Sequence, residues 1–128
     1  MIGSTSAPGS SGALSLKLPD LFALARHPER LRWEPFRPGV RIHRLYGNQE
    51  TGPSAALLLY EPGASIPYHE HLGYEHLLIL SNTQVDESGE SAAGTFIVNP
   101  PGGRHSVMTP HGGMVLAIWE RPVAFVEK

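Results

Sequence analysis

Two histidines separated by a single residue, His69 and His71, are the most informative chemical feature of the sequence. Side chains two positions apart in an extended strand point to the same side, so both imidazoles can reach one metal ion. Glu75 follows His71 after a glycine that lets the backbone bend, and can add a carboxylate at the same point. His105, which follows a turn rich in proline and glycine, is the candidate fourth ligand. Taken alone, the His69 and His71 pair is explained equally well by two exposed or hydrogen-bonded histidines, so the rest of the chain must decide.

The composition restricts the chemistry that is available. The 128-residue chain has no cysteine, which excludes disulfides, thiolate ligands and cysteine nucleophiles and leaves nitrogen and oxygen as metal donors. Lys and Arg number 10 against 12 Asp and Glu, with no basic block, so nucleic acid is not an expected partner. The longest apolar runs, 55–60 and 114–119, are far shorter than the roughly 20 residues that cross a bilayer. The N-terminus lacks the pattern of a secretion signal, so we expect a cytoplasmic protein with no membrane partner.

The elements that must position these residues are mostly strands. The length suits one domain, and 14 glycines with 12 prolines indicate frequent turns rather than a helix bundle. Residues 1–13 are expected to form a flexible tail and 14–128 a single domain, with a helix of roughly two to three turns between Asp20 and His27. The predicted strands are 40–46, 55–60, 65–68, 74–80, 84–86, 94–98, 103–108 and 114–119. Short strands between turns favour an all-β sandwich or barrel.

The spacing of the candidate ligands resembles the two sequence motifs of the cupin superfamily. The first motif has the form Gly-x5-His-x-His-x3-4-Glu-x6-Gly and the second the form Gly-x5-Pro-x-Gly-x2-His-x3-Asn. The matching residues are Gly63, His69, His71 and Glu75 in the first motif, and Gly94, Pro100, Gly102 and His105 in the second. Asn82 and Thr109 stand where the motifs usually end in Gly and Asn, at positions outside the ligand set.

Within the cupins, the chain resembles most the cupin domain of ChrR-type anti-sigma factors and their stand-alone relatives. The segments that carry this resemblance are 75–80, 86–89, 93–95 and 99–102. It implies an RmlC-like jelly roll, a double-stranded β-helix barrel, that binds one divalent metal ion through His69, His71, Glu75 and His105 and forms a homodimer. Full-length regulators of this type also carry a helical zinc domain with cysteine ligands. Because this sequence has no cysteine, sigma-factor binding is not expected of it.

Three imidazoles and one carboxylate suit zinc, iron, manganese, nickel or copper, and the sequence does not rank these metals. Four ligands around tetrahedral zinc would make a closed site, as in a non-catalytic module that senses or binds a metal or small ligand. Around a six-coordinate metal they would leave positions for a small oxygenated molecule. The resemblance to cupins then implies a metal-dependent enzyme, either a dioxygenase that cleaves β-diketones or an isomerase or decarboxylase. In either interpretation the partner is a small molecule.

Residues near the ligands are assigned by strand alternation. Leu77, Ile79 and Phe96 are expected to line the barrel interior, mainly as apolar core. Side chains with the opposite parity to the ligands, or between them, should point away from the metal, namely His76, Arg104 and Glu70. The two tryptophans, Trp33 and Trp119, are interpreted as core or interface aromatics.

Overall fold

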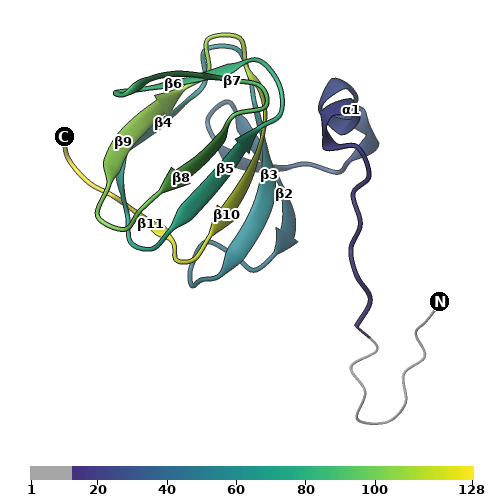
Figure 1. Cartoon of the computed structure of the whole chain (residues 1–128), viewed down its shortest axis with the longest axis horizontal. Coiled ribbons are helices and arrows are strands. Elements are labelled where there is room, and N and C mark those ends of the chain that lie inside the picture. The colour runs from purple at the N-terminus through teal and green to yellow at the C-terminus, as the bar shows by residue number, and fades with distance from the viewer. Residues whose placement is uncertain (1–12) are drawn as a thin grey trace.

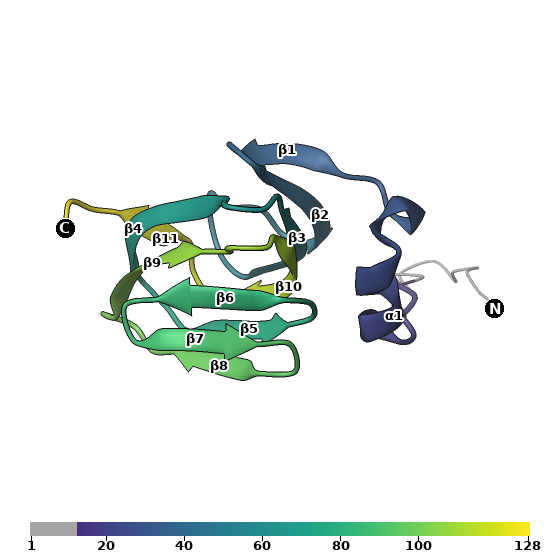
Figure 2. The ribbon, with the colours of Figure 1, turned by 90° about the horizontal axis from the view of Figure 1, so that it is seen from above.

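The computed structural model describes residues 13–128, in which two antiparallel sheets face each other (Figure 1 and Figure 2). One sheet has six strands in the order β1-β2-β3-β10-β5-β8, and the other has five in the order β11-β4-β9-β6-β7. The strands are β1 Glu34–Arg37, β2 Val40–Tyr46, β3 Ser54–Tyr60, β4 Ser65–His71, β5 Glu75–Ile79, β6 Thr83–Asp86, β7 Gly89–Ala92, β8 Phe96–Asn99, β9 Arg104–Met108, β10 Gly113–Trp119 and β11 Val123–Phe125. This arrangement confirms the all-β expectation and the predicted hairpin, in which β2 pairs with β3.

The helix α1, Leu21–Arg26, precedes the sandwich and packs against one face of the six-stranded sheet (Figure 1). The Asp20 carboxylate accepts a hydrogen bond from the backbone N–H of Ala23 and so caps its start. Six residues make it shorter than the two to three turns that the sequence predicts, because Pro28 excludes helical backbone at His27. A 3-10 helix, Pro28–Arg30, follows. None of the helices in the described part of the chain has the length and apolarity that crossing a bilayer requires.

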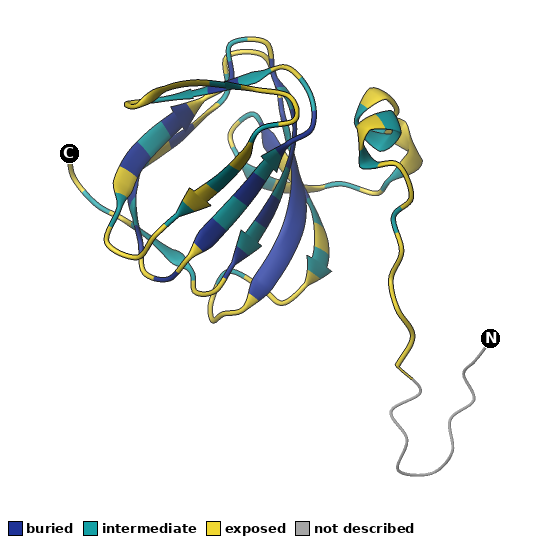
Figure 3. Ribbon diagram, in the orientation of Figure 1, coloured by how far each residue is buried: buried dark blue, intermediate teal, exposed yellow. Residues whose placement is uncertain are grey.

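The core lies between the two sheets and follows the alternation of the strands (Figure 3). In β5, for example, Leu77 and Ile79 are buried, as predicted, while the residues that alternate with them, His76 and Leu78, are only partly covered. Strand β3 is buried along almost its whole length. Its inner face contributes Leu58 to the core, and Leu57 on its other face packs in a second cluster that includes Leu21 and Leu24 of α1. The helix therefore closes the outer side of the sheet that carries Glu75.

Two sequence expectations meet the structure differently. The tail predicted for residues 1–13 lies outside the described residues apart from Ala13, which is exposed. The placement of Phe96 in the barrel interior is wrong, because its side chain is 59% exposed. Phe96 pairs with Leu78 of β5, and residues directly opposite each other share a face of the sheet. Leu78 is on the outer face, so Ile97 points inward instead.

Candidate metal centre

Strand register brings three predicted ligands together. His69 and His71 lie two residues apart on β4, and both are buried on the inner face of the five-stranded sheet. In the pairing of β4 with β9, His105 lies directly opposite His69. Backbone hydrogen bonds also join the turn before β9 to the end of β4. The N–H of His71 donates to the carbonyl oxygen of Gly103 at 2.9 Å, and the N–H of Gly102 donates to the carbonyl oxygen of His71 at 2.8 Å. The glycine and proline turn thus places His105 beside the histidine pair.

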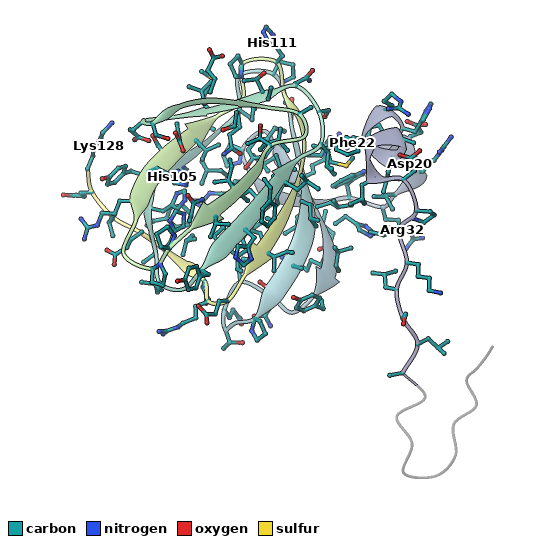
Figure 4. All side chains as sticks on the ribbon, in the orientation of Figure 1. Asp20, Phe22, Arg32, His105, His111 and Lys128 are labelled. Atoms are coloured by element: carbon teal, nitrogen blue, oxygen red, sulfur yellow. The ribbon has the colours of Figure 1, made fainter. Side chains whose placement is uncertain are left out.

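The three imidazoles form one compact cluster inside the barrel. Ring centroids are 5.1 Å apart for His69 and His71, and 4.7 Å apart for each of the two pairs that include His105. One ring nitrogen from each histidine can be chosen so that all lie within 4.8 Å of one another. Figure 4 shows His105 among nitrogen-bearing side chains between the sheets. Exposed fractions of 2 to 6% mean that the cluster is shielded from bulk water.

Hydrogen bonds fix the tautomers of two of these rings. The Nδ1 atom of His69 lies 2.7 Å from the carbonyl oxygen of Pro67, and Nδ1 of His105 lies 2.9 Å from Oδ2 of Asp86. Carbonyl and ionised carboxylate oxygens only accept hydrogen bonds, so each Nδ1 must carry the proton. The Nε2 lone pair of each ring is therefore free to bind a metal. Backbone carbonyl and carboxylate partners of this kind are typical of metal-binding histidines.

Several buried ring nitrogens of the cluster have no hydrogen-bond partner in the described part of the chain. Among the described residues, Nε2 of His105 and both ring nitrogens of His71 lack a hydrogen-bond partner. Nε2 of His71 lies 3.1 Å from Oε1 of Glu75, which is ion-pair distance without hydrogen-bond geometry. A buried polar atom without a partner costs about 1–3 kcal/mol, so such atoms rarely accumulate without a function. A divalent metal ion fits this arrangement, because it would accept a lone pair from Nε2 of His105 and from the unprotonated ring nitrogen of His71.

Glu75 borders the histidine cluster but is not part of it. Its Oε1 accepts a hydrogen bond from Nδ2 of Asn99 at 2.9 Å, and its Oε2 accepts one from Nε1 of Trp119 at 2.7 Å. Burial alone would raise the pKa of Glu75, but His71 and these two donors outweigh it and hold the pKa below its ordinary value of 4.5. Glu75 is therefore ionised at neutral pH and carries a negative charge next to the imidazoles.

The protonation state of His69 also suits metal binding. Burial is the main cause that lowers the pKa of His69 below its ordinary value of 6.5, and the neighbouring His105 and His71 act in the same direction. The hydrogen bond to Pro67 and the charge of Glu75 oppose this shift without reversing it. His69 is therefore neutral at pH 7, which is the form that binds metals.

A cavity of about 160 Å³ opens beside the cluster. Apolar side chains such as Leu58, Leu77, Val107, Trp119 and Phe125 form most of its wall, and the polar residues on it include His69, Glu75, His105, Tyr60, Gln84 and Arg37. Burial raises the pKa of Tyr60 well above its ordinary value, and the charge of Glu75 adds to the shift, so its hydroxyl stays protonated. A cavity of about 150 Å³ can bind benzene, so this one suits a small organic molecule.

The residues predicted to face away from the metal do so. Arg104 forms an ion pair with Glu70, with Nη2 and Oε1 2.8 Å apart, on the outer side of the barrel. His76 stacks between Tyr74 and Phe96, with ring centroids 6.2 and 5.7 Å away. These outcomes confirm the alternation assigned from the sequence around the ligands.

The sequence analysis missed three residues that hold the predicted ligands in place. Asp86 orients His105, while Asn99 and Trp119 hydrogen-bond Glu75. Trp119 is buried, as a core aromatic should be, but it is also a donor to the site. Trp119 lies opposite Glu75 because β10 pairs with β5, and the sequence does not reveal this pairing.

Comparisons with known proteins agree with the fold described above. The sequence matches the family described as ChrR Cupin-like domain over residues 23–124. None of the curated proteins matches it significantly. Among solved structures, the complex of Rhodobacter sphaeroides SigE with the anti-sigma ChrR is similar, with 28% identity and a TM-score of 0.64 over 75% of this chain. The match covers 53% of that chain, so the present chain spans about half the length of this relative.

Two more distant structures share the fold. An acetylacetone dioxygenase from Acinetobacter johnsonii has 16% identity and a TM-score of 0.70, covering 100% of this chain and 84% of the other. An RmlC-like cupin protein from Ralstonia eutropha JMP134 has 16% identity and a TM-score of 0.68, covering 78% and 69%. At this identity the likeness shows a cupin fold and nothing about activity. With the motifs, the two-sheet jelly roll and the family match over most of its length, the chain belongs to the ChrR cupin-like domain family of cupins.

Proposed function

We propose that this domain binds one divalent metal ion through His69, His71 and His105, with Glu75 as the fourth ligand, and acts on a small oxygenated molecule as a metal-dependent enzyme of dioxygenase type. The observation that carries the proposal is the set of buried imidazole nitrogens without partners, next to a cavity of small-molecule size. A bound metal ion would supply Lewis acidity toward a carbonyl or enolate oxygen and, if it is iron, electrons for dioxygen.

The chain's own residues prepare the site for this chemistry. Pro67 and Asp86 hold two imidazoles in the orientation that exposes Nε2, so little reorganisation is needed when a ligand arrives. Leu77, Val107 and Phe125 form apolar wall around a bound molecule and reduce its contact with water. The Tyr60 hydroxyl, which stays protonated, can donate a hydrogen bond to an oxygen of that molecule.

A second candidate function is a non-catalytic module that binds a metal ion or small ligand. The membership in the ChrR cupin-like family favours it, because a similar solved structure is that of an anti-sigma protein in complex with SigE. In this case zinc would be held by all four side chains in a closed tetrahedral shell, with no position left for a substrate. The two functions therefore differ in metal identity and in turnover.

Elemental analysis of protein purified from metal-balanced medium, followed by oxygen-uptake measurements with acetylacetone and related β-diketones, tests the proposal. We expect about one metal ion per chain and, with iron, oxygen uptake that depends on the diketone. Stoichiometric zinc without turnover under any loading would favour the binding module. Metal-free protein that also fails to bind added zinc, iron, manganese or nickel would rule out the metal-dependent enzyme and the metal-binding form of the module, and would leave only a module that binds a small ligand.

A further inference from the structure

The cavity wall contains a cation that the metal site does not use. Arg37 lies at the end of β1, the edge strand of the six-stranded sheet, and lines the same cavity as His69, His105 and Glu75. Among residues 13–128 Arg37 forms no ion pair, and its Nε atom is buried without a hydrogen-bond partner. The side chain as a whole is only partly buried, but its shielded Nε–H is a donor without a partner, which costs free energy until a ligand accepts its hydrogen bond. Glu75 lies at ion-pair distance from His71 and not from Arg37, so it is not the missing partner.

An irregularity in the backbone directs Arg37 into the cavity. The register between β1 and β2 shifts between Pro35 and Arg37, so that Arg37, rather than Phe36, lies opposite Val40. Val40 is 2% exposed and belongs to the core between the sheets, and opposite residues share a face. A bulge of this kind re-aims a side chain and is common beside active sites. Without the extra residue, Arg37 would point toward solvent.

The guanidinium group is also held at a fixed place relative to the histidines. Its Cζ atom lies 3.9 Å from the ring centroid of Phe125, and the same ring lies 5.9 Å from the ring of His69. Stacking on an aromatic face leaves the edge of a guanidinium, with its N–H donors, free for a ligand. A molecule only a few bonds long can therefore touch the arginine and the histidine cluster at once.

From this placement we propose that Arg37 is the specificity-determining residue of the cavity and that its ligand is a small oxo-acid. The carboxylate of the oxo-acid binds the Arg37 guanidinium, and its ketone oxygen faces the histidine cluster. The position of the ketone rests on the proposed metal site, whereas the recognition of the carboxylate rests on Arg37 alone. A forked guanidinium binds a carboxylate through two parallel N–H to oxygen bonds, which a neutral ketone cannot match.

Two isosteric probes test this inference, levulinate and hexane-2,5-dione, which differ only in having a carboxylate or an acetyl group at one end. Their dissociation constants are measured by NMR titration of the full chain, loaded with zinc because it is diamagnetic. We expect levulinate to bind at least about tenfold more tightly than the dione, in line with the strength of charged hydrogen bonds. Equal affinities for the two probes in the wild-type protein would overturn the proposal.

Variants separate recognition from folding. In Arg37→Met, which keeps an unbranched side chain against Phe125, the preference for levulinate should disappear, mainly because levulinate binds more weakly. Arg37→Lys should keep part of the preference, because it retains the charge but not the fork. Arg41→Met is the matched control, since Arg41 is exposed on β2 and does not line the cavity. A preference that persists in Arg37→Met, or that Arg41→Met removes equally, would contradict the assignment.

The same titrations with metal-free protein distinguish a failure of this inference from a failure of the proposed function. If zinc does not bind, the metal site is wrong, yet a preference for levulinate that depends on Arg37 still supports the carboxylate site. If zinc binds in the wild type and in Arg37→Met but neither discriminates between the probes, the metal site stands and the role of Arg37 is refuted. Thermal unfolding of each variant shows whether it is folded under the conditions of the titration.

Discussion

The Nδ1 atom of His105 lies 2.9 Å from Oδ2 of Asp86, and this one contact determines which nitrogen of the ring faces the metal centre. The carboxylate accepts the Nδ1 proton, so the lone pair is on Nε2, which is buried without a partner among the described residues. Hydrogen bonds from Ser88 and His105 hold the pKa of Asp86 below its ordinary value, although its partial burial alone would raise it. The Asp86 carboxylate that orients His105 is therefore negatively charged over the whole physiological pH range.

Replacing the Asp86 carboxylate should weaken metal binding without removing a ligand. In Asp86→Ala the imidazole of His105 can rotate and adopt the other tautomer, and loss of such a partner typically lowers metal affinity about 10 to 100-fold. Competition with a chromophoric chelator measures this change. Glu90→Ala is the control. Glu90 is exposed on the neighbouring strand β7, and its substitution removes the same negative charge without touching His105. Equal affinities of the two variants would show that Asp86 does not orient a metal ligand.

Removing a histidine of the cluster should remove the metal but not the fold. His69→Ala and His105→Ala are expected to purify with far less than one metal ion per chain, as determined by elemental analysis. The β-sandwich should persist in both, because its core is formed by residues such as Ile42, Leu58 and Ile79 rather than by the ligands. His76→Ala, on the outer face of β5, should keep its metal. Full occupancy in both cluster variants would refute the site.

Glu75→Gln tests whether the carboxylate is a fourth ligand. A neutral amide is a much poorer metal ligand than a carboxylate, so we expect at least about tenfold weaker metal binding by chelator competition. Glu70→Gln is the control, because Glu70 lies on the outer side of the barrel and pairs with Arg104. Unchanged affinity in Glu75→Gln would reduce the site to three histidines and would show that the Glu75 carboxylate does not contribute to metal binding.

The same substitution should lower the stability of the metal-free protein in a pH-dependent way. The pKa of Glu75 is lowered in the folded state, so its ionisation stabilises the fold above the unfolded value of 4.5 and this contribution is lost as the pH falls through the folded value. In Glu75→Gln an amide group must face the Asn99 or Trp119 donor, at a cost of about 1–3 kcal/mol. Urea unfolding should show this difference at pH 7 and a smaller one at pH 4. A difference independent of pH would contradict it.

The sequence predicts those parts of the site that follow from local alternation. His69 and His71 share a face because they are two apart in one strand, and His76 and Arg104 point away for the same reason. The prediction for Phe96 failed because parity was counted across a turn, and only the pairing with Leu78 determines its face. Alternation is therefore reliable within a strand and unreliable from one strand to the next.

The residues that support the ligands could not be predicted in this way. Asn99 and Trp119 are 24 and 44 positions away from Glu75, and only the order of strands β8, β5 and β10 in the sheet brings them to it. Arg37 was missed because a register shift in β1, which leaves no pattern in the sequence, turns its side chain inward. Local periodicity thus predicts that His69 and His71 share a face, and the resemblance to the cupin motifs adds Glu75 and His105 as candidate ligands. Sheet order and a bulge determine the residues around them.

Acidification should destabilise the metal-free protein through His69. Burial lowers the pKa of His69 in the folded state, so below pH 6.5 the unfolded chain binds a proton that the folded chain excludes. Stability is therefore lost as the pH falls from 6.5 toward the lowered folded value. In His69→Gln this loss should be smaller, which thermal unfolding at pH 7.5 and 5.5 in the presence of a chelator measures. His111→Gln, an exposed control, should follow the wild type. If His69→Gln and the wild type lose the same stability, His69 is not the group responsible, and its burial does not exclude the proton.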